Sequence, residues 1–297
     1  MDFAFSDGIP VGSECRRLLL EEVEGAVLQL ARFDDAPDVA IHETRKHNKR
    51  LRSVLLLARP LLDSGDLAPA NRLVRDAARL FSDARDALVL QHTCDKVSVH
   101  FGSESEKAFA TVRAILESRH AALLRDESLP LKIAEAIADF REAGSIIERW
   151  NWDQVTYDEV FSAIVSNYRL GFKDFQKARA SRDPEECHDW RKRAKYLSYH
   201  LTLLSLLDPG TSGEWAAATG ELASCLGDHH DLAVFESAIG DGSDYRISEK
   251  AARALIKLSA KRRAELEDRA FRDGKVIYRD TAEELHLRFA GLVEATV

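Results

Sequence analysis

Basic side chains recur at helical spacing in one stretch of the chain, and that stretch occurs twice. The first copy is residues 42–57, HETRKHNKRLRSVLLL, and the second is residues 188–203, HDWRKRAKYLSYHLTL. Aligned on one another, the copies match a histidine and three cations: His42, Arg45, Lys46 and Lys49 align with His188, Arg191, Lys192 and Lys195. Guanidinium and ammonium groups at this density can bind phosphate oxygens through charge-assisted hydrogen bonds. The pattern therefore indicates a site that binds an anion.

On a helical wheel at about 100° per residue, the cations of each copy gather on one face and the leucines on the other. Like charges at this spacing destabilise a helix by roughly a few tenths of a kcal/mol per pair. Because the sequence carries this cost twice at matching positions, we interpret the face as a binding surface. A solvated basic face would show the same pattern and remains the alternative.

The composition indicates an all-helical protein with a local basic patch. The chain has 297 residues with 15 Gly and 7 Pro, and 45% of its residues are hydrophobic. Its net charge of −8 makes it a poor general nucleic-acid binder unless its cations are gathered in one place. Four cysteines without CxxC spacing suggest reduced thiols and a cytoplasmic location. No signal peptide is apparent, and no apolar run reaches the roughly 18 residues of a membrane span.

Helix start and stop signals divide the chain into a series of helices. Ser13 and either Ser82 or Asp83 are expected N-caps, and Pro37 and Pro184 are expected to open the two basic helices. The expected helices cover about 13–33, 37–60, 67–81, from 82, 105–124, 131–147, 157–180, from 184, a stretch containing Trp215 and Leu222 that leads into 227–235, from 248, and 281–294. Turns are expected at 210–213 and 241–244.

Two further blocks repeat in the same order as the basic helices. Residues 82–90, SDARDALVL, match 227–235, GDHHDLAVF, so that Asp83 and Asp86 align with Asp228 and Asp231. We expect these aspartates to cap helix starts and to pair with nearby arginines. Residues 105–123 match 248–266 at nearly the same offset. The repeat predicts halves 12–150 and 151–297, folded as two four-helix-type bundles related by a pseudo-twofold axis within one domain.

The helix after the first basic helix adds Arg72, Arg75 and Arg79 on one face. The second half lacks these cations, since Ala217, Gly220 and Ser224 stand at the matching positions. The site is therefore expected to be lopsided, or to be completed by other cations, namely Arg169, Arg253, Lys257 and Lys261.

With its duplicated H-x-x-R-K-x-x-K helices and D-x-x-D segments, the chain resembles the CHAD family, the conserved histidine α-helical domains, over nearly its whole length. The resemblance implies two four-helix bundles around a basic central cavity or pore that binds inorganic polyphosphate, and association with polyphosphate granules and polyphosphate-metabolising proteins. Carried onto this sequence, the binding residues are His42, Arg45, Lys46, Lys49, Arg52, Arg72, Arg75, Arg79, His188, Arg191, Lys192 and Lys195. No E-x-E-x-K motif of a triphosphatase domain is present, so a stand-alone member is expected.

No nucleophile elbow, phosphate-cradling glycine loop or paired catalytic carboxylates are apparent, so we predict a non-catalytic binding protein without cofactor or metal. One alternative is a metal phosphohydrolase of the HD type, in which His229, His230 and Asp231 would be ligands with His200 and Asp268. The other is a scaffold that binds RNA or an acidic protein, although specific nucleic-acid binding is not expected because no aromatic platform is apparent.

Overall fold

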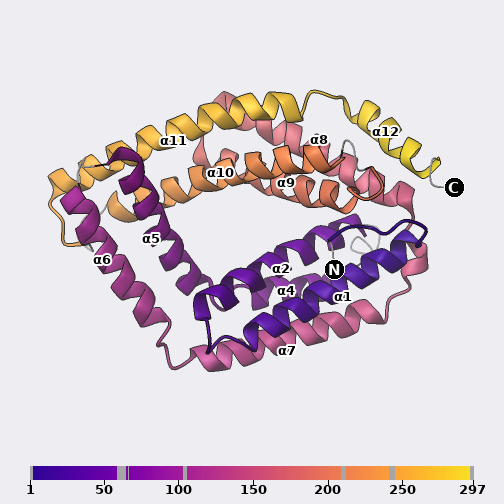
Figure 1. Cartoon of the computed structure of the whole chain (residues 1–297), viewed down its shortest axis with the longest axis horizontal. Coiled ribbons are helices and arrows are strands. Elements are labelled where there is room, and N and C mark those ends of the chain that lie inside the picture. Colours follow the sequence, from indigo (N-terminus) through magenta and orange to yellow (C-terminus); the bar gives the residue numbers. More distant parts are fainter. Residues whose placement is uncertain are drawn as a thin grey trace.

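The computed structural model describes residues 3–58, 65, 67–102, 106–208, 212–240 and 245–294. Within these ranges every regular element is helical, which confirms the all-α prediction (Figure 1). The elements are α1 (Val11–Leu30), α2 (Pro37–Leu57), α4 (Ala68–Ala77), α5 (Ser82–Phe101), α6 (Glu106–Leu123), α7 (Leu129–Glu148), η1 (Trp152–Gln154), α8 (Tyr157–Ser181), α9 (Pro184–Leu203), α10 (Ser212–Gly240), α11 (Glu249–Ile277) and α12 (Ala282–Glu294). No helix of this described part is long and apolar enough to cross a membrane.

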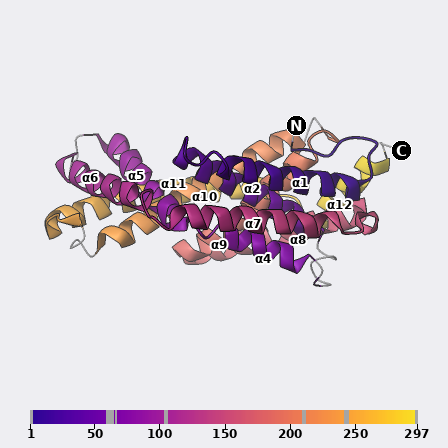
Figure 2. The same cartoon turned by 90° about the horizontal axis from the view of Figure 1, so that it is seen from below.

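The helices form two groups that meet along α2 and α9. In the first group α1 packs on α2 and α7, and α4 packs on α7. In the second group α9 lies between α8 and α10, while α11 packs on α10 and α12 packs on α8. Helices α5 and α6 pack on each other and reach across to α11 at one end of the elongated molecule (Figures 1 and 2). The pseudo-twofold relation between the halves stays a prediction.

Local sequence signals set most helix starts. Pro37 and Pro184 stand at the first positions of α2 and α9 as predicted, where the missing N–H has no intrahelical acceptor to lose. The predicted Ser13 cap is wrong, because α1 begins at Val11 and Ser13 lies inside it. Helix α5 is preceded by Phe81 without a side-chain cap, so neither Ser82 nor Asp83 fills that role. Features expected at Pro60, Gly210 and 241–244 lie outside the described residues, whereas Gly213 is helical.

The two halves differ where the D-x-x-D segments lie. In the first half a turn at residues 78–81, closed by hydrogen bonds such as Arg79 N to Asp76 O at 2.9 Å, separates α4 from α5. In the second half α10 runs without interruption through the matching residues. Asp228 and Asp231 therefore lie inside a helix, and the prediction that they cap a helix start is wrong.

The leucine stripes of both basic helices are buried, as the wheel predicted. Leu51 and Leu55 of α2 and Leu197 and Leu201 of α9 have no exposed surface. A hydrogen-bond contact of 3.0 Å between His200 Nε2 and the Ser53 carbonyl joins α9 to α2 inside this core. Burial of the leucine faces fixes the rotation of both helices about their axes. The cations of each helix therefore lie on the side opposite its own leucines.

Close backbone packing at Gly12 provides a test of this fold. A Cβ at Gly12 would overlap the Trp152 carbonyl, where α1 crosses η1. We expect Gly12→Ala to lower the free energy of unfolding by about 1–3 kcal/mol in a urea titration, since backbone must move to relieve the clash. Gly291→Ala is the matched control, because a Cβ there meets nothing within 4 Å; it should stabilise the protein by at most about 1 kcal/mol. Equal unfolding midpoints for the two variants would contradict the packing of α1 on η1.

Candidate functional site

Four cations from α2 and α9 form the centre of the candidate site. We name Arg45 and Lys49 of α2 with Arg191 and Lys195 of α9 the α2–α9 basic cluster. Burial, followed by the positive charges of the other three members, lowers the pKa of the Lys49 ammonium to about 8. Lys49 is nevertheless reached by solvent. The structure therefore brings together cations that the sequence placed far apart, with α2 contributing from one group of helices and α9 from the other.

On α9 the two cations of the cluster contact their neighbours without forming an ion pair with a described residue. The Lys195 Nζ lies 4.7 Å from the centre of the Tyr199 ring, and its pKa is lowered by burial and by Arg191. The Arg191 Nε is buried without a hydrogen-bond partner among the described residues. A Cβ at Gly227 would lie 3.1 Å from that nitrogen, so a glycine is what lets the guanidinium lie against α10.

Acidic groups near the cluster are few within the described ranges. Asp86 of α5 is close enough to Arg45, and Asp231 of α10 to Arg191, to interact electrostatically. Burial raises the pKa of both carboxyl groups despite these arginines. Neither aspartate forms an ion pair with a described residue, so the predicted Asp–Arg pairing exists only at longer range. Arg45 instead donates from Nη1 to the Ala78 carbonyl, at 3.2 Å, at the end of α4.

The histidines of the duplicated motif, His42 and His188, lie beside this cluster in different environments. His42 is exposed, and burial of part of its ring together with Arg85 and Lys49 lowers its pKa. His188 stacks on His230, with ring centres 3.9 Å apart. Burial, followed by the neighbouring His230, lowers the pKa of His188 to about 4. Both histidines are therefore neutral at pH 7 in the absence of a bound anion.

The remaining cations predicted on the two basic helices are less available for binding an anion. Lys46 is paired with Glu43 at 3.0 Å and Lys192 with Asp189 at 2.9 Å, one turn away on the same exposed face. Arg52 is half-buried, and its Nε has no hydrogen-bond partner among the described residues. Lys46 adds positive charge at His42, and Lys192 adds it at His188, beside the α2–α9 basic cluster.

Arginines of the α4 region are not brought into the cluster. Asp76 forms ion pairs with Arg75 at 2.9 Å and with Arg79 at 3.5 Å, and Arg72 adds its field to the same carboxylate. Helix α4 packs mainly on α7, and Arg72 and Arg79 are exposed. The predicted shared helical face holds only for Arg72 and Arg75, because α4 ends at Ala77 and Arg79 lies in the turn that follows. Sequence spacing also could not show which neighbour α4 meets.

The cations expected to complete the second half are also dispersed. Arg169 lies 3.8 Å from Glu283 of α12, and Arg253 is bound to Glu249 of its own helix at 2.7 Å. Lys261 lies over the Phe101 ring at 5.2 Å, and Lys257 is exposed on α11. None of these contacts involves the α2–α9 basic cluster.

Two arginines that the sequence pattern did not assign to the site lie near the cluster. Arg85 of α5 adds positive charge at both Arg45 and Lys49. Arg50 of α2 acts in the same way on Lys195. Arg85 stands inside the first D-x-x-D segment. The sequence signal that could have identified Arg85 is its place directly before Asp86 in that segment.

The residues proposed for an HD-type metal centre are not brought together. His230 stacks on His188, His200 bonds to the Ser53 carbonyl, and Asp268 lies 3.5 Å from Arg182. Within the described ranges, the only His, Cys, Asp and Glu donors grouped closely enough for a metal ion are those of three buried residues, Cys187, His229 and Glu267. Only His229 of these was singled out from the sequence.

Comparison with known proteins identifies the family of this chain and a shared fold. The family model described as CHAD domain matches residues 13–240. A solved structure, PptA from Streptomyces chartreusis, superposes with a TM-score of 0.65 at 13% identity, covering 92% of this chain and 100% of that one, which shows a shared fold. No curated protein matches the sequence. Since the family model covers most of the chain, this protein belongs to the CHAD-domain family.

Proposed function

We propose that this protein binds inorganic polyphosphate, without hydrolysing it, at the α2–α9 basic cluster. The observation that carries the proposal is the gathering of four cations from α2 and α9, which interact electrostatically with one another and form no ion pair with a described residue. Gathering them costs free energy that only an anion can recover. A linear polyanion recovers it at several positions at once, because its charges repeat along the chain.

The chemistry of the cluster fits a chain of phosphates. Arg45 and Arg191 offer planar forks that bind two oxygens of one phosphate, and Lys49 and Lys195 act as point charges between them. The cations come from two helices, so a chain lying along the α2–α9 junction would contact both. The proposal extends to association with polyphosphate granules in the cytoplasm.

Binding should be measured by calorimetric titration of long-chain polyphosphate at two salt concentrations. We expect binding that weakens steeply as salt rises, because the ligand releases condensed counterions as it does from other polyanions. An RNA competitor of the same charge should displace polyphosphate poorly, because the described cluster offers no row of aromatic rings for base stacking. A folded protein that fails to bind polyphosphate at low salt would refute the proposal, and equal competition by RNA would favour the scaffold alternative.

The arginines of the α4 region are predicted to contribute less to polyphosphate binding than the α2–α9 basic cluster. Replacing Arg72, Arg75 and Arg79 with alanine removes three exposed cations that already share one carboxylate. We expect affinity for polyphosphate to fall by less than about tenfold, since exposed and screened charges contribute about 1 kcal/mol or less. The same titration measures the effect. A loss as large as that caused by removing the α2–α9 basic cluster would show that the α4 region forms part of the site.

A further inference from the structure

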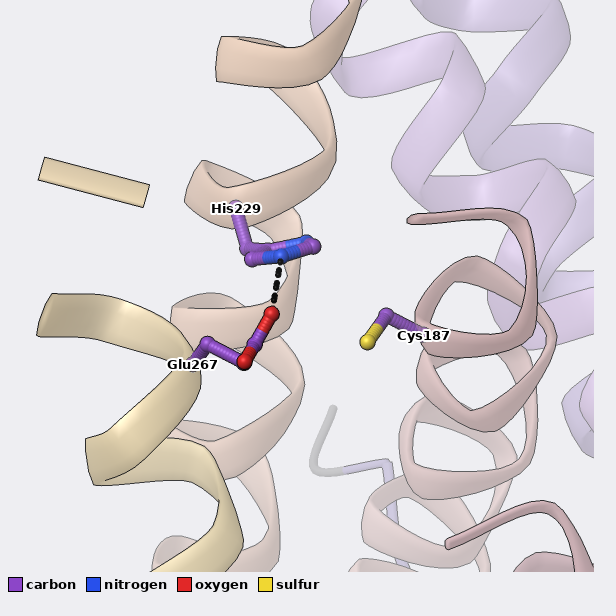
Figure 3. Close-up of side chains that lie close together, drawn as sticks. All are labelled: Cys187, His229 and Glu267. Atoms are coloured by element: carbon purple, nitrogen blue, oxygen red, sulfur yellow. Dashed lines mark ion pairs between the residues drawn. The ribbon is translucent and has the colours of Figure 1, made fainter. Parts of the chain in front are cut away.

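A second group of polar side chains lies on the other side of α9 and α10. Cys187 comes from the first turn of α9, His229 from the middle of α10 and Glu267 from α11. Their exposed fractions are 1%, 0% and 6%. One donor atom from each lies within 4.8 Å of the other two, and the side chains point toward one another (Figure 3).

We propose that Cys187, His229 and Glu267 bind a zinc ion that ties α9, α10 and α11 together. The proposal does not depend on polyphosphate binding. The cation would take the thiolate sulfur, one imidazole nitrogen and one carboxylate oxygen, with the fourth tetrahedral position left to water. The thiol proton leaves to solvent as the sulfur binds the metal.

The first argument is the state of His229. Its side chain is fully buried, yet neither ring nitrogen has a hydrogen-bond partner in the part of the chain that the structure describes. The nearer nitrogen, Nε2, lies 3.6 Å from Glu267 Oε2, which is too long for a hydrogen bond. Buried polar groups are almost always satisfied, so an unpartnered imidazole that faces a thiol and a carboxylate lacks a partner of some kind. A metal ion placed among the three donors supplies it.

The second argument is the spacing of the donors. In a tetrahedral zinc site with bonds of about 2.0–2.3 Å, neighbouring ligand atoms lie about 3.5 Å apart. The 3.6 Å separation of His229 Nε2 and Glu267 Oε2 already meets this distance. Because all three donors lie within 4.8 Å of one another, the Cys187 sulfur needs a shift of about 1 Å, which a small rotation about its Cα–Cβ bond within one rotamer well provides.

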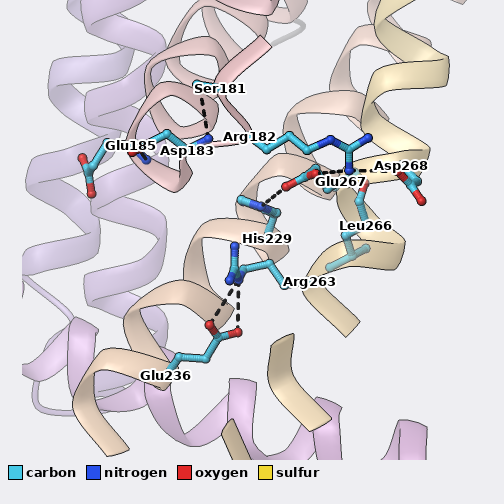
Figure 4. Close-up of polar contacts among 11 residues, drawn as sticks. Ser181, Arg182, Asp183, Glu185, His229, Glu236, Arg263, Leu266, Glu267 and Asp268 are labelled. Atoms are coloured by element: carbon cyan, nitrogen blue, oxygen red, sulfur yellow. Dashed lines mark hydrogen bonds and ion pairs between the residues drawn. The ribbon is translucent and has the colours of Figure 1, made fainter. Parts of the chain in front are cut away.

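The third argument is the support around Glu267. The Arg182 Nη1 donates to Glu267 Oε1 at 2.7 Å, which leaves Oε2 directed at His229 (Figure 4). Hydrogen bonds of this kind commonly orient carboxylates that bind metals. The other nearby cation, Arg263, is neutralised by Glu236 at 3.1 Å. The arginines around the three donors are therefore paired, and they do not prevent entry of a divalent cation.

The fourth argument comes from the repeat. When the first and third repeat blocks are each extended by one residue, the repeat aligns Ile41, Ala84 and Leu124 with Cys187, His229 and Glu267. Ile41 and Ala84 are buried and Leu124 packs against the core. The first half therefore fills these positions with apolar side chains, so the polar donors of the second half are not required for packing helices of this kind.

The donor set selects the metal. A thiolate with an imidazole and a carboxylate suits zinc, whereas Mg²⁺ and Ca²⁺ prefer oxygen ligands alone. The Cys187 side chain is 1% exposed, so the thiol of metal-free protein should react slowly with thiol reagents.

Metal content of the full chain is the direct test. Protein treated with a chelator and then with excess zinc, and freed of unbound metal, should retain about one zinc ion per chain by elemental analysis. It should also show a higher melting temperature with zinc than with magnesium. A folded protein that retains no zinc would overturn the proposal.

Variants locate the ion. Cys187→Ala should weaken zinc binding by at least about 100-fold in competition with a chromophoric chelator, since loss of a ligand exceeds the loss of a supporting contact. Cys94→Ala is the matched control, because Cys94 is equally buried but belongs to α5. Equal retention of zinc by both variants would place the ion elsewhere.

Cobalt gives a measurement that needs no variant. Co²⁺ bound to the wild-type chain should show thiolate-to-cobalt charge transfer and the intense visible bands of a four-coordinate ion. A spectrum without charge transfer would exclude the cysteine ligand and overturn the proposal, even if Cys187→Ala fails to fold.

Discussion

Replacing Arg45, Lys49, Arg191 and Lys195 together with alanine is expected to reduce affinity for long-chain polyphosphate by at least about 100-fold. Hydrogen bonds to charged groups contribute about 1.5–3 kcal/mol each, so loss of even two of them exceeds this factor. The fold should survive, because the change removes mutual repulsion and the cations have no ion-pair partners among the described residues. Calorimetric titration measures the affinity, and thermal unfolding shows whether the variant is folded.

The matched control removes four exposed cations elsewhere: Lys173→Ala, Arg179→Ala, Arg272→Ala and Lys275→Ala, on α8 and α11. It changes the net charge by the same amount, so it isolates the contribution of position. We expect a loss of less than about tenfold, because exposed charges are screened by salt. Equal losses in the two variants would mean that polyphosphate senses only the overall charge, and no loss in the first would refute the site.

The second large effect is a fall in affinity above pH 8. The pKa of Lys49 in the free protein is about 8, lowered by burial and by the cations on α2, α5 and α9. A bound polyanion stabilises the protonated form, so binding above this pH must first return a proton to Lys49. Affinity should therefore be nearly constant from pH 6.5 to 7.5 and fall by about tenfold per pH unit above 8.

Lys49→Arg is the control for this pH dependence, because arginine stays charged throughout the range. The variant should bind polyphosphate at pH 7 and lose little affinity by pH 9. Titration of both proteins in buffers of equal ionic strength removes the effect of salt. A wild-type affinity that does not change between pH 7 and pH 9, or a variant that falls in parallel with it, would show that Lys49 does not contact the ligand.

Much of the architecture could be predicted from the sequence because it depends on local rules. Apolar periodicity set the buried faces of α2 and α9, and prolines at 37 and 184 set their first residues. The duplicated motif of histidine and cations indicates the CHAD family by itself, and the family model confirms it. Boundaries that depend on neighbours were less accurate, since neither Ser13 nor Ser82 caps the helix assigned to it.

Which charged faces meet depends on how the helices pack on one another. Helical periodicity states that Arg45 and Lys49 share one face and that Arg72, Arg75 and Arg79 share another, but not what lies opposite either face. The packing of α2 on α9 joins the first pair to Arg191 and Lys195, whereas α4 turns its arginines toward Asp76 beside α7.

The grouping of Cys187, His229 and Glu267 was decided in the same way. His188 follows Cys187 in the chain, and His230 follows His229. These two following histidines stack on each other near Arg191, while Cys187 and His229 face α11. Neighbouring positions on a helix point about 100° apart, so one pair of helices presents a different chemistry on each side. Local sequence patterns predict the helices, their buried faces and the residue types they carry. Which of those residues meet across helices depends on long-range packing, which no local pattern in the chain encodes.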